Sequence, residues 1–442
     1  SSFLQVLCIL QNGTLQMSKE NKKIKVLLLG DHPLAPSGVG TQLKYITEAM
    51  VKTGRYQFVC LGGAVKHDDY EPKQIDGGEH WSGEDWVVYP VDGYGNEEMI
   101  RSAIWTHKPD ILMFMTDPRF YEWLWSIENE IRPLVPMVYY HVWDNYPYPK
   151  YNKKWYDSTD VIASISKVTY DIVNNVSPET ENHYIPHAVH GDIFMKRPDD
   201  EVLKFKEEHL GENKDRMVFF WNNRNARRKQ SGTLLHWFNE FAEQVGPDNV
   251  TLIMHTDPRD PHGQDLPAII TDLDIGDGRI ILSKEKVPPK VLSFMYNMAD
   301  CTINISDAEG FGLGTLESLA CGTPIIVNMT GGLQEQVTDG EEWFGIGIEP
   351  ASKAIIGSLD VPYIREDRLN KEEFIEALKK IYNMSKEERE ELGRKGTEHV
   401  RKNYNFEDFK NRWIELLDSV HENHGSWENR KGYKTWEVKE IA

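Results

Sequence analysis

The sequence predicts an α/β protein with two doubly wound domains in tandem. Short, continuously apolar runs alternate with amphipathic segments of helical length, and this alternation starts again in the second half of the chain. Continuous apolar runs separated by helices indicate parallel strands that are covered on both faces. The length of 442 residues and the hydrophobic content of 40% are sufficient for two separate cores.

The first predicted domain, residues 22–200, begins with the buried strand "IKVLLLG" at residues 24–30. After a loop, residues 41–54 form a predicted helix, in which Leu43 and Met50 share one face. Further strands are predicted at residues 57–63, 109–115, 136–141 and 160–166.

The second predicted domain, residues 201–404, repeats this pattern after a polar segment without a strand signal. Strands are predicted at residues 215–223, 250–256, 278–283 and 301–306. Helices are predicted at residues 232–246 and 291–300, and again over most of residues 371–404.

The two ends of the chain are predicted separately. Residues 1–21 are interpreted as a leader or disordered segment, because "MSKENKKIKVLLLG" from Met17 reads like a natural beginning. The mildly apolar start before it lacks the basic residues of a signal peptide. Residues 405–442 are predicted to contain a final helix and a polar tail. Trp413 and Leu417 give this helix an apolar face, so we expect it to pack on the first domain.

Composition limits the classes of partner. A net charge of −20 argues against nucleic-acid binding through a basic face and against tight docking on an anionic membrane, and no stable membrane insertion is expected. No apolar run has the length of a membrane span. The four cysteines form no C-x-x-C pair, which favours a reducing compartment, and a cytoplasmic protein is predicted. The oligomeric state is left open.

A glycine-rich loop joins the strand at residues 301–306 to a predicted short helix at residues 315–321, and it carries Glu309, with Glu317 eight positions later. Glycines expose backbone N–H groups near the positively polarised N-terminus of a helix, which suits a phosphate. Glu317 can then bind two ribose hydroxyls, and Glu309 faces whatever lies beyond the phosphates. The alternative is a structural loop with two solvated acids.

The stretch "EGFGLGTLESLACGTPIIV", followed by "GGLQEQVTDG", resembles the donor site of retaining glycosyltransferases of family four, the glycosyl transferases group 1. The resemblance implies the GT-B fold, in which two Rossmann-like domains face each other across a cleft and the C-terminal helix crosses back to the first domain. It implies that Glu309 lies by the donor sugar and that Glu317 binds the ribose. The backbone implied to hold the diphosphate is that of Phe311, Gly312, Leu313, Gly314 and Thr315.

Basic residues crowd the loop after the strand at residues 215–223, in an otherwise acidic chain. Members of the resembled family carry an arginine and, five residues later, a lysine on the diphosphate, and Arg224 and Lys229 have this spacing. Fixed cations stabilise the charge that develops on a leaving diphosphate. Arg227 or Arg228 can share this role, and a solvated charged loop is the alternative reading.

Two further candidates lie in the first domain. His141 ends an apolar strand, and the resemblance implies that it contacts the donor sugar in the transition state, whereas alone it fits a structural histidine equally well. Gly38 and Gly40 follow the first strand and resemble the family's first-domain glycine loop by the diphosphate and acceptor. They do not complete a G-x-G-x-x-G fingerprint, so a structural turn is the alternative.

The predicted function is that of a retaining hexosyltransferase, which moves a hexose from a nucleotide-diphosphate sugar to a hydroxyl acceptor. The aromatic residues of "YHVWDNYPYPKYNKKWYD" favour a carbohydrate acceptor, although they suit a packed core as well. No cofactor and no metal are expected, because no metal-ligand motif is present and GT-B enzymes generally need none. The alternatives are another GT-B enzyme, such as a nucleotide-sugar epimerase, or a non-catalytic nucleotide-sugar-binding protein.

Overall fold

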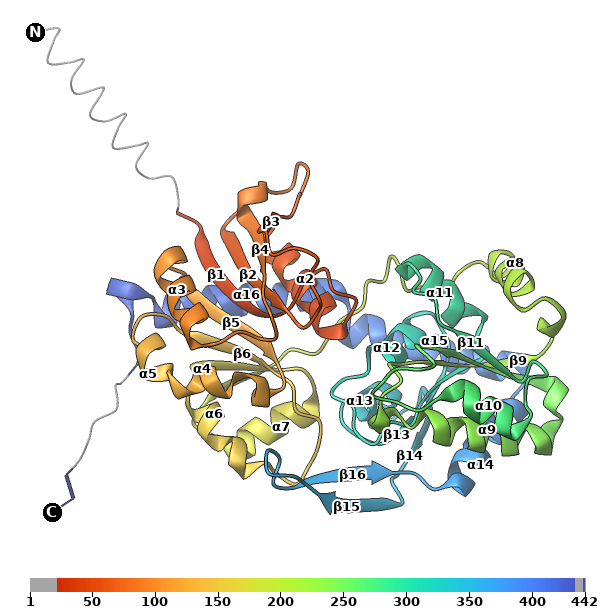
Figure 1. Cartoon of the computed structure of the whole chain (residues 1–442). Coiled ribbons are helices and arrows are strands. Elements are labelled where there is room, and N and C mark those ends of the chain that lie inside the picture. The colour runs from red at the N-terminus through yellow and green to blue at the C-terminus, as the bar shows by residue number, and fades with distance from the viewer. Residues whose placement is uncertain (1–21, 434–439, 442) are drawn as a thin grey trace, which may run out of the picture. The chain divides into compact units, whose positions relative to one another are not determined.

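A computed structural model describes residues 22–433 and 440–441 of the chain (Figure 1). The described residues form two compact units, and these do not follow a single cut in the sequence. The first unit contains the residues up to Tyr140, Ser158–Ile162 and the residues from Lys410 onward. The second unit contains His141–Asp157 and Ala163–Phe409. The predicted leader, residues 1–21, lies outside the described residues, as do residues 434–439 of the predicted tail.

The first sheet has eight strands in the order β3-β4-β2-β1-β5-β6-β7-β8 among the described residues. The pairs β1–β2, β1–β5 and β2–β4 are parallel, whereas β3 pairs antiparallel with β4. The strands are β1 (Ile24–Asp31), β2 (Tyr56–Gly63), β3 (Lys73–Gln74), β4 (Trp86–Pro90), β5 (Ile111–Thr116), β6 (Met137–His141), β7 (Val161–Ser164) and β8 (Glu181–Tyr184). The edge strand β3 therefore departs from the expected parallel sheet.

The first helix begins earlier than the sequence predicts. Helix α2 (Gly38–Val51) starts at Gly38 because the Oγ of Ser37 accepts a hydrogen bond from the backbone N–H of Gly40, at 3.0 Å. Such a cap satisfies a donor of the first turn. The other helices before the second sheet are α3 (Glu97–His107), α4 (Glu122–Ser126), α5 (Glu128–Ile131), α6 (Lys153–Asp157), α7 (Lys167–Val176) and α8 (Asp199–Leu210).

The second sheet has six strands in the order β11-β10-β9-β12-β13-β14, and every pair is parallel. The strands are β9 (Met217–Asn222), β10 (Val250–His255), β11 (Ile280–Ser283), β12 (Cys301–Asn304), β13 (Ile325–Asn328) and β14 (Gly345–Ile348). Because their carboxyl ends share one edge, the loops that follow β9, β12 and β13 lie close together.

Two groups of helices cover the second sheet (Figure 1). One group packs α9 (Ser231–Val245) against α10 (Leu266–Leu273) and α14 (Lys371–Asn383). The other packs α11 (Pro289–Met298) against α8 and α12 (Leu313–Ala320), and α12 against α15 (Lys386–Asn403). The core between sheet and helices is hydrophobic and includes the fully buried rings of Phe219, Trp221, Phe238 and Phe241. The predicted α/β fold with two doubly wound sheets is confirmed.

A small separate sheet of the second unit is among the elements that were not predicted. The antiparallel hairpin of β15 (Ser352–Ile356) and β16 (Ile364–Arg368) forms a separate two-stranded sheet. Its strand β16 is bound to the segment after β6, since the N–H of Arg365 donates to the carbonyl of Tyr146 at 2.8 Å. The backbone carbonyl of Arg365 accepts from Asn145 Nδ2, also at 2.8 Å.

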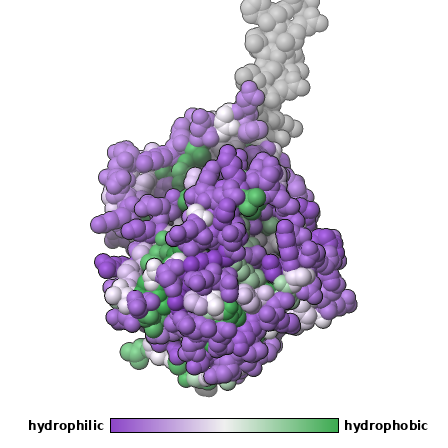
Figure 2. Space-filling model, turned by 90° about the vertical axis from the view of Figure 1, so that its right-hand side faces the viewer, coloured by the Kyte–Doolittle hydropathy of each residue, from purple (hydrophilic) through white to green (hydrophobic). Residues whose placement is uncertain are grey.

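Residues 410–433 belong to the first unit and pack tightly in it. In helix α16 (Phe406–His424), Trp413 is fully buried, and its ring lies 4.8 Å from that of Tyr140. Beyond the helix, the Arg430 guanidinium donates to Asp160 Oδ1 at 2.9 Å, and both side chains are at least 96% covered, being 4% and 3% exposed. Figure 2 shows a face of the molecule that is mostly hydrophilic, in accord with the high charge.

In the part of the chain that the structure describes, no helix combines the length and hydrophobicity needed to cross a membrane. Cys60, Cys301 and Cys321 are buried free thiols.

Candidate active site

The glycine-rich loop leads from β12 into α12, as predicted, but the helix begins at Leu313 rather than at Thr315. Gly312 precedes it with φ of +92°, a left-handed conformation that favours glycine. At Gly314 a Cβ atom would lie 3.0 Å from the backbone oxygen of Asn222, at the end of β9. The bare backbone thus lets the start of α12 approach the neighbouring strand end.

Glu309 lies in this loop and is almost fully buried. Its Oε2 forms an ion pair with the Nζ of Lys229 and accepts a hydrogen bond from Asn304 Nδ2 at 3.1 Å. Its Oε1 lies 3.8 Å from a guanidinium nitrogen of Arg228. The loop after β9 and the loop after β12 therefore meet at one carboxylate.

The charge of this carboxylate is fixed by its neighbours. Burial alone would raise the pKa of Glu309, but the nearby charges of Lys229 and Arg228 outweigh this and hold the pKa at about 2. Burial lowers the pKa of the Lys229 ammonium, which Glu309 opposes. Glu309 is consequently ionised at neutral pH and can accept hydrogen bonds from hydroxyl groups.

Glu317 lies one turn into α12 and has a different environment. Its Oε2 accepts a hydrogen bond from the hydroxyl of Tyr296 at 2.7 Å, and this hydroxyl accepts one from Asn222 Nδ2 at 2.8 Å. Burial raises the pKa of Glu317 to about 7, against the lowering effect of Tyr296. The two glutamates therefore differ in their ionisation at neutral pH. Glu309 is ionised and paired with cations, whereas Glu317 is partly protonated and accepts a hydrogen bond from the phenol of Tyr296.

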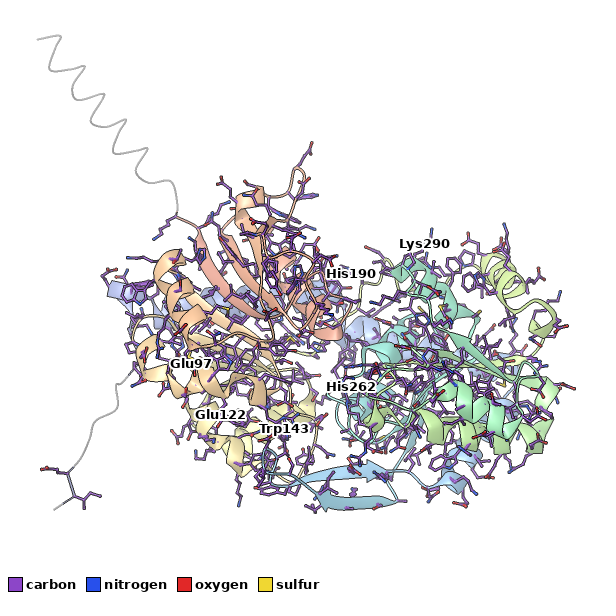
Figure 3. All side chains as sticks on the ribbon, in the orientation of Figure 1. Glu97, Glu122, Trp143, His190, His262 and Lys290 are labelled. Carbon is purple, nitrogen blue, oxygen red and sulfur yellow. The ribbon has the colours of Figure 1, made fainter. Side chains whose placement is uncertain are left out.

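The predicted basic pair is separated. Lys229 is buried at Glu309, whereas the Arg224 guanidinium donates to Asp260 Oδ2 at 2.9 Å and is 62% exposed. A further nitrogen of Arg224 lies 2.8 Å from Nδ1 of His262, on the loop between β10 and α10 (Figure 3). Arg227 is 82% exposed and lies 3.6 Å from Glu366. Of the four basic residues of this loop, Arg228 and Lys229 contact Glu309.

His141 ends β6 and is fully buried. Its Nε2 lies 2.7 Å from the hydroxyl of Tyr156, and burial lowers the pKa of the imidazole to about 3, so it is neutral. The chain beyond it runs to the glycine-rich loop between β12 and α12, since a Cβ on Gly310 would lie 3.5 Å from Cγ1 of Val142. Trp143, in the same segment (Figure 3), is 4% exposed and belongs to the core.

A second glycine pair, Gly331 and Gly332, packs against the glycine-rich loop between β12 and α12. Gly332 donates its N–H to the carbonyl of Glu309 at 3.1 Å, and a Cβ on Gly331 would lie 1.7 Å from that carbonyl oxygen. Gln336, in α13 (Leu333–Val337), donates from Nε2 to the carbonyls of Phe311 and Gly312, at 2.7 and 2.9 Å. These contacts fix the loop backbone.

The side chains of the loop residues serve packing. Phe311 is buried, with its ring 5.2 Å from that of His187, and the hydroxyl of Thr315 donates to Gln336 Oε1 at 2.6 Å. Any contact of these residues with a diphosphate would thus be made by the backbone, and their predicted role stays a prediction.

Gly38 and Gly40 lie in the first turn of α2, in the first unit. A Cβ on Gly40 would lie 2.7 Å from the backbone oxygen of His32, so glycine is required there for local packing. Their predicted place beside the diphosphate and acceptor stays a prediction.

The described residues contain no group of three or more His, Cys, Asp or Glu side chains suited to a metal ion.

Comparison with known protein families gives a match over the second half of the chain. Residues 204–399, which contain the basic loop, Glu309 and Glu317, match the family "Glycosyl transferases group 1". The resemblance drawn from the motif is confirmed here.

A relative with a related sequence is the D-inositol 3-phosphate glycosyltransferase of Acidothermus cellulolyticus. It is 39% identical over 104 residues, which are 23% of this chain and 23% of the relative. The chain thus matches about a quarter of the length of the first curated relatives, at 23% and 21%.

Two solved structures show that the chain has the GT-B fold. Sucrose-phosphate synthase from Thermosynechococcus elongatus superposes with a TM-score of 0.70 at 16% identity, covering 91% of this chain and all of that one. Anabaena Alr3699/HepE, solved in complex with UDP and glucose, gives 0.65 at 14% identity, covering 90% of this chain and 100% of that one.

The sequence did not point to three further residues of this site. Tyr296 donates to Glu317 and Asn304 donates to Glu309, while Asn222 donates to the hydroxyl of Tyr296. Tyr296 belongs to a helix whose apolar pattern explains it as a core residue, so its polar contact is visible only in three dimensions.

Proposed function

We propose that this protein is a retaining glycosyltransferase, which transfers a hexose from a nucleotide-diphosphate sugar to a hydroxyl acceptor without a metal ion. The observation that carries the proposal is the pair Glu309 and Glu317 at the two ends of one loop–helix junction, the first ion-paired with Lys229. The family of residues 204–399 supports the reaction class, and the UDP and glucose bound to Alr3699/HepE support the donor class.

The donor is proposed to lie over the start of α12. Backbone N–H groups at a helix N-terminus bind a diphosphate favourably. The carboxylate of Glu317 accepts hydrogen bonds from the ribose hydroxyls. Glu309, ionised and buried, accepts hydrogen bonds from the hexose hydroxyls. Because its charge is already balanced by Lys229, it orients the sugar rather than attacking the anomeric carbon.

The chemistry is proposed to be substitution on one face of the sugar. As the glycosidic bond breaks, negative charge grows on the leaving diphosphate, and Lys229 and Arg228 stabilise it. The leaving phosphate oxygen then takes the proton of the acceptor hydroxyl, so the anomeric configuration is retained. His141, neutral and buried, is proposed to act as a hydrogen-bonding group beside the sugar.

The test is a screen of UDP-glucose, GDP-mannose and ADP-glucose by thermal shift, because a ligand that binds the native state raises its melting temperature by mass action. The donor that gives the largest shift is then incubated with hydroxyl acceptors in the presence of EDTA, and NMR reports the anomeric configuration of the product. Retention with undiminished turnover in EDTA is expected.

Other outcomes select the alternatives. Conversion of the donor to an epimer without any acceptor identifies an epimerase. Binding without turnover in any acceptor mixture identifies a nucleotide-sugar-binding protein. A screen in which no nucleotide sugar changes the melting temperature refutes the proposal.

A further inference from the structure

The guanidinium of Arg224 lies on the side of β9 opposite to the other member of the predicted basic pair. Its Nε donates to Oδ2 of Asp260 at 2.9 Å, on the loop between β10 and α10. In the sheet order β11-β10-β9-β12, the strands β10 and β12 flank β9 on opposite sides. Lys229, from the same loop after β9, pairs instead with Glu309, which follows β12. The two basic residues therefore bind carboxylates on opposite sides of β9.

The position of Asp260 is fixed by the fold of the second unit. Its loop is attached to the loop after β9, because the buried Asn225 donates from Nδ2 to the carbonyl of Gln264 at 2.8 Å. The N–H of Arg227 donates to the carbonyl of His262 at 3.0 Å. The Oδ1 of Asp260 accepts a hydrogen bond from the N–H of His262 at 2.9 Å. The carboxylate thus has a fixed position that does not depend on its arginine partner.

Two groups hold the guanidinium of Arg224 at this place. One of its terminal nitrogens lies 2.8 Å from Nδ1 of His262, and the same nitrogen lies 3.5 Å from Oδ1 of Asp260 (Figure 3). The hydrogen bond from Arg224 holds the pKa of Asp260 at about 2, so this carboxylate is charged at neutral pH. The arginine side chain is nevertheless mostly exposed, and exposed ion pairs are weak. The contact is therefore formed but is easily exchanged for another.

The backbone of Arg224 lies close to the proposed diphosphate position. Two residues before it, the carbonyl oxygen of Asn222 would lie 3.0 Å from a Cβ on Gly314, in the first turn of α12. Two residues of extended chain span at most about 7 Å. The long side chain of Arg224 can therefore turn from Asp260 toward a diphosphate over the start of α12. An arginine can pair with two phosphate oxygens at once.

Asp260 and a bound diphosphate thus offer two alternative partners to one guanidinium. A diphosphate carries more negative charge than a single carboxylate, so it can displace Asp260 from an exposed ion pair. The displaced carboxylate keeps its charge and its fixed position, so it is ready to pair with Arg224 again. Each exchange costs the diphosphate the free energy of the pair that is broken. The presence of Asp260 therefore weakens the binding of a diphosphate.

We propose that Asp260 competes with the bound diphosphate for the guanidinium of Arg224 and thereby promotes release of the nucleoside diphosphate product. Asp260 is in this account a positioning residue, because it acts through Arg224. The inference rests on the proposed glycosyltransferase function and adds to it a residue that controls departure of the product.

The first test measures the binding of UDP, GDP and ADP by calorimetry, and continues with the one that binds most tightly. Asp260→Asn should lower its Kd by up to about fivefold, which is the contribution of one exposed ion pair. The asparagine keeps an oxygen that accepts from the N–H of His262. Asp257→Asn is the matched control, since Asp257 is an exposed acid of the same loop that accepts from the N–H of Arg259 at 3.0 Å. It should bind like the wild type.

The same substitution in a protein without Arg224 separates the proposed competition from the general effect of a removed negative charge. In the Arg224→Ala background, Asp260→Asn should lose most of its effect, because no guanidinium is left to release. A wild-type Kd in Asp260→Asn would overturn the inference. An equal fall of the Kd in both backgrounds would overturn it too, since the effect would then not pass through Arg224.

The second test observes the guanidinium directly by NMR. The Nε–H group of Arg224 gives a signal that is identified by its absence in Arg224→Ala. Saturation with the nucleoside diphosphate should move this signal, because Nε–H exchanges its carboxylate partner for a phosphate. An unmoved signal in the saturated protein would overturn the inference.

The kinetic consequence is stronger product inhibition. The inhibition constant of the nucleoside diphosphate should fall in Asp260→Asn by the same factor as its Kd, without a gain in kcat. A merely structural role of Asp260 predicts weaker binding in this variant, not tighter binding. Failure of the proposed function gives a different result, because the wild type would then bind none of the three nucleoside diphosphates.

Discussion

Lys229 and Glu309 form a buried ion pair that joins the loop after β9 to the loop after β12; their side chains are 9% and 10% exposed. A buried pair of this kind is costly to break, because removal of one partner leaves the other charge uncompensated. The pair therefore has two measurable consequences, one for catalysis and one for stability.

Lys229→Met should lower kcat on the order of 10²-fold, since a charge that stabilises the leaving diphosphate is lost. It should also lower the free energy of unfolding by about 3–5 kcal/mol, because Glu309 keeps its charge in the interior. Steady-state kinetics and urea denaturation measure the two effects. The double variant Lys229→Met/Glu309→Gln should recover stability but not turnover.

Arg224→Ala is the comparison variant. The guanidinium of Arg224 is exposed and is held by Asp260, so we expect a smaller loss of kcat than in Lys229→Met. Equal losses would place Arg224 on the diphosphate as well.

The two glutamates should affect different kinetic constants. Glu317→Gln should mainly raise the donor KM, because the ribose loses an ionised acceptor, whereas Glu309→Gln should mainly lower kcat by about tenfold or more. Initial rates over a matrix of donor concentrations separate the two constants. Glu366→Gln, on the partly buried hairpin strand β16, serves as a control for loss of an acid in the same unit. Wild-type kinetics in both site variants would contradict the assignment.

Donor affinity should depend on pH through Glu317. Its pKa is raised to about 7, so the ionised fraction grows from about one tenth at pH 6 to about nine tenths at pH 8. Because the carboxylate is the better acceptor for ribose hydroxyls, the donor Kd should fall up to about tenfold over this range. Calorimetric titration at several pH values measures it.

Two variants make this pH dependence specific. Glu317→Gln should flatten the profile. Tyr296→Phe removes the hydrogen bond that lowers the pKa of Glu317, so the midpoint should move to higher pH. A Tyr296→Phe profile with the wild-type midpoint would show that Tyr296 only fills space.

Gly331→Ala should disrupt the glycine-rich loop between β12 and α12. The added Cβ would meet the Glu309 carbonyl oxygen at 1.7 Å, and Gly331 has φ of +50°, which an alanine adopts at a cost of about 1–2 kcal/mol. We expect lower donor affinity and a lower melting temperature. Gly191→Ala is the matched control, because its Cβ would meet no atom within 4 Å and its φ is not positive. A Gly331→Ala protein that binds the donor like the wild type would refute the fixed-loop interpretation.

The strands and helices of the second sheet could be predicted well because each follows a local rule. Continuous apolar runs gave β10 and β12 nearly to the residue, and the amphipathic pattern gave α9 within one residue. The hairpin of β15 and β16 escaped prediction because β15 is fully exposed and carries no alternation of polar and apolar residues. Helix α2 was placed too late because the cap by Ser37 depends on its contact with Gly40.

The site was predictable where it lies in one stretch of sequence and not where distant segments meet. Glu309, Glu317 and the glycines between them belong to a recognisable loop–helix motif. The pairing of Lys229 with Glu309 joins residues 80 positions apart, and no sequence spacing distinguishes it from a pairing with Arg224. The same holds for Tyr296, which reaches Glu317 only because α11 packs on α12.

The residues after α16 pack against the surface of the first unit. Arg430 is joined to Asp160, and the indole of Trp427 donates to the carbonyl of Pro109 at 2.9 Å, while its ring lies 5.3 Å from that of Trp105. A shortened protein that stopped at Gly425 is a natural choice for crystallisation, because the helix ends there. It would expose the surface that these residues cover and would remove the ion pair of Asp160 with Arg430, so that Asp160 would keep its ion pair with Arg132. Any engineered C-terminus therefore belongs beyond residue 433.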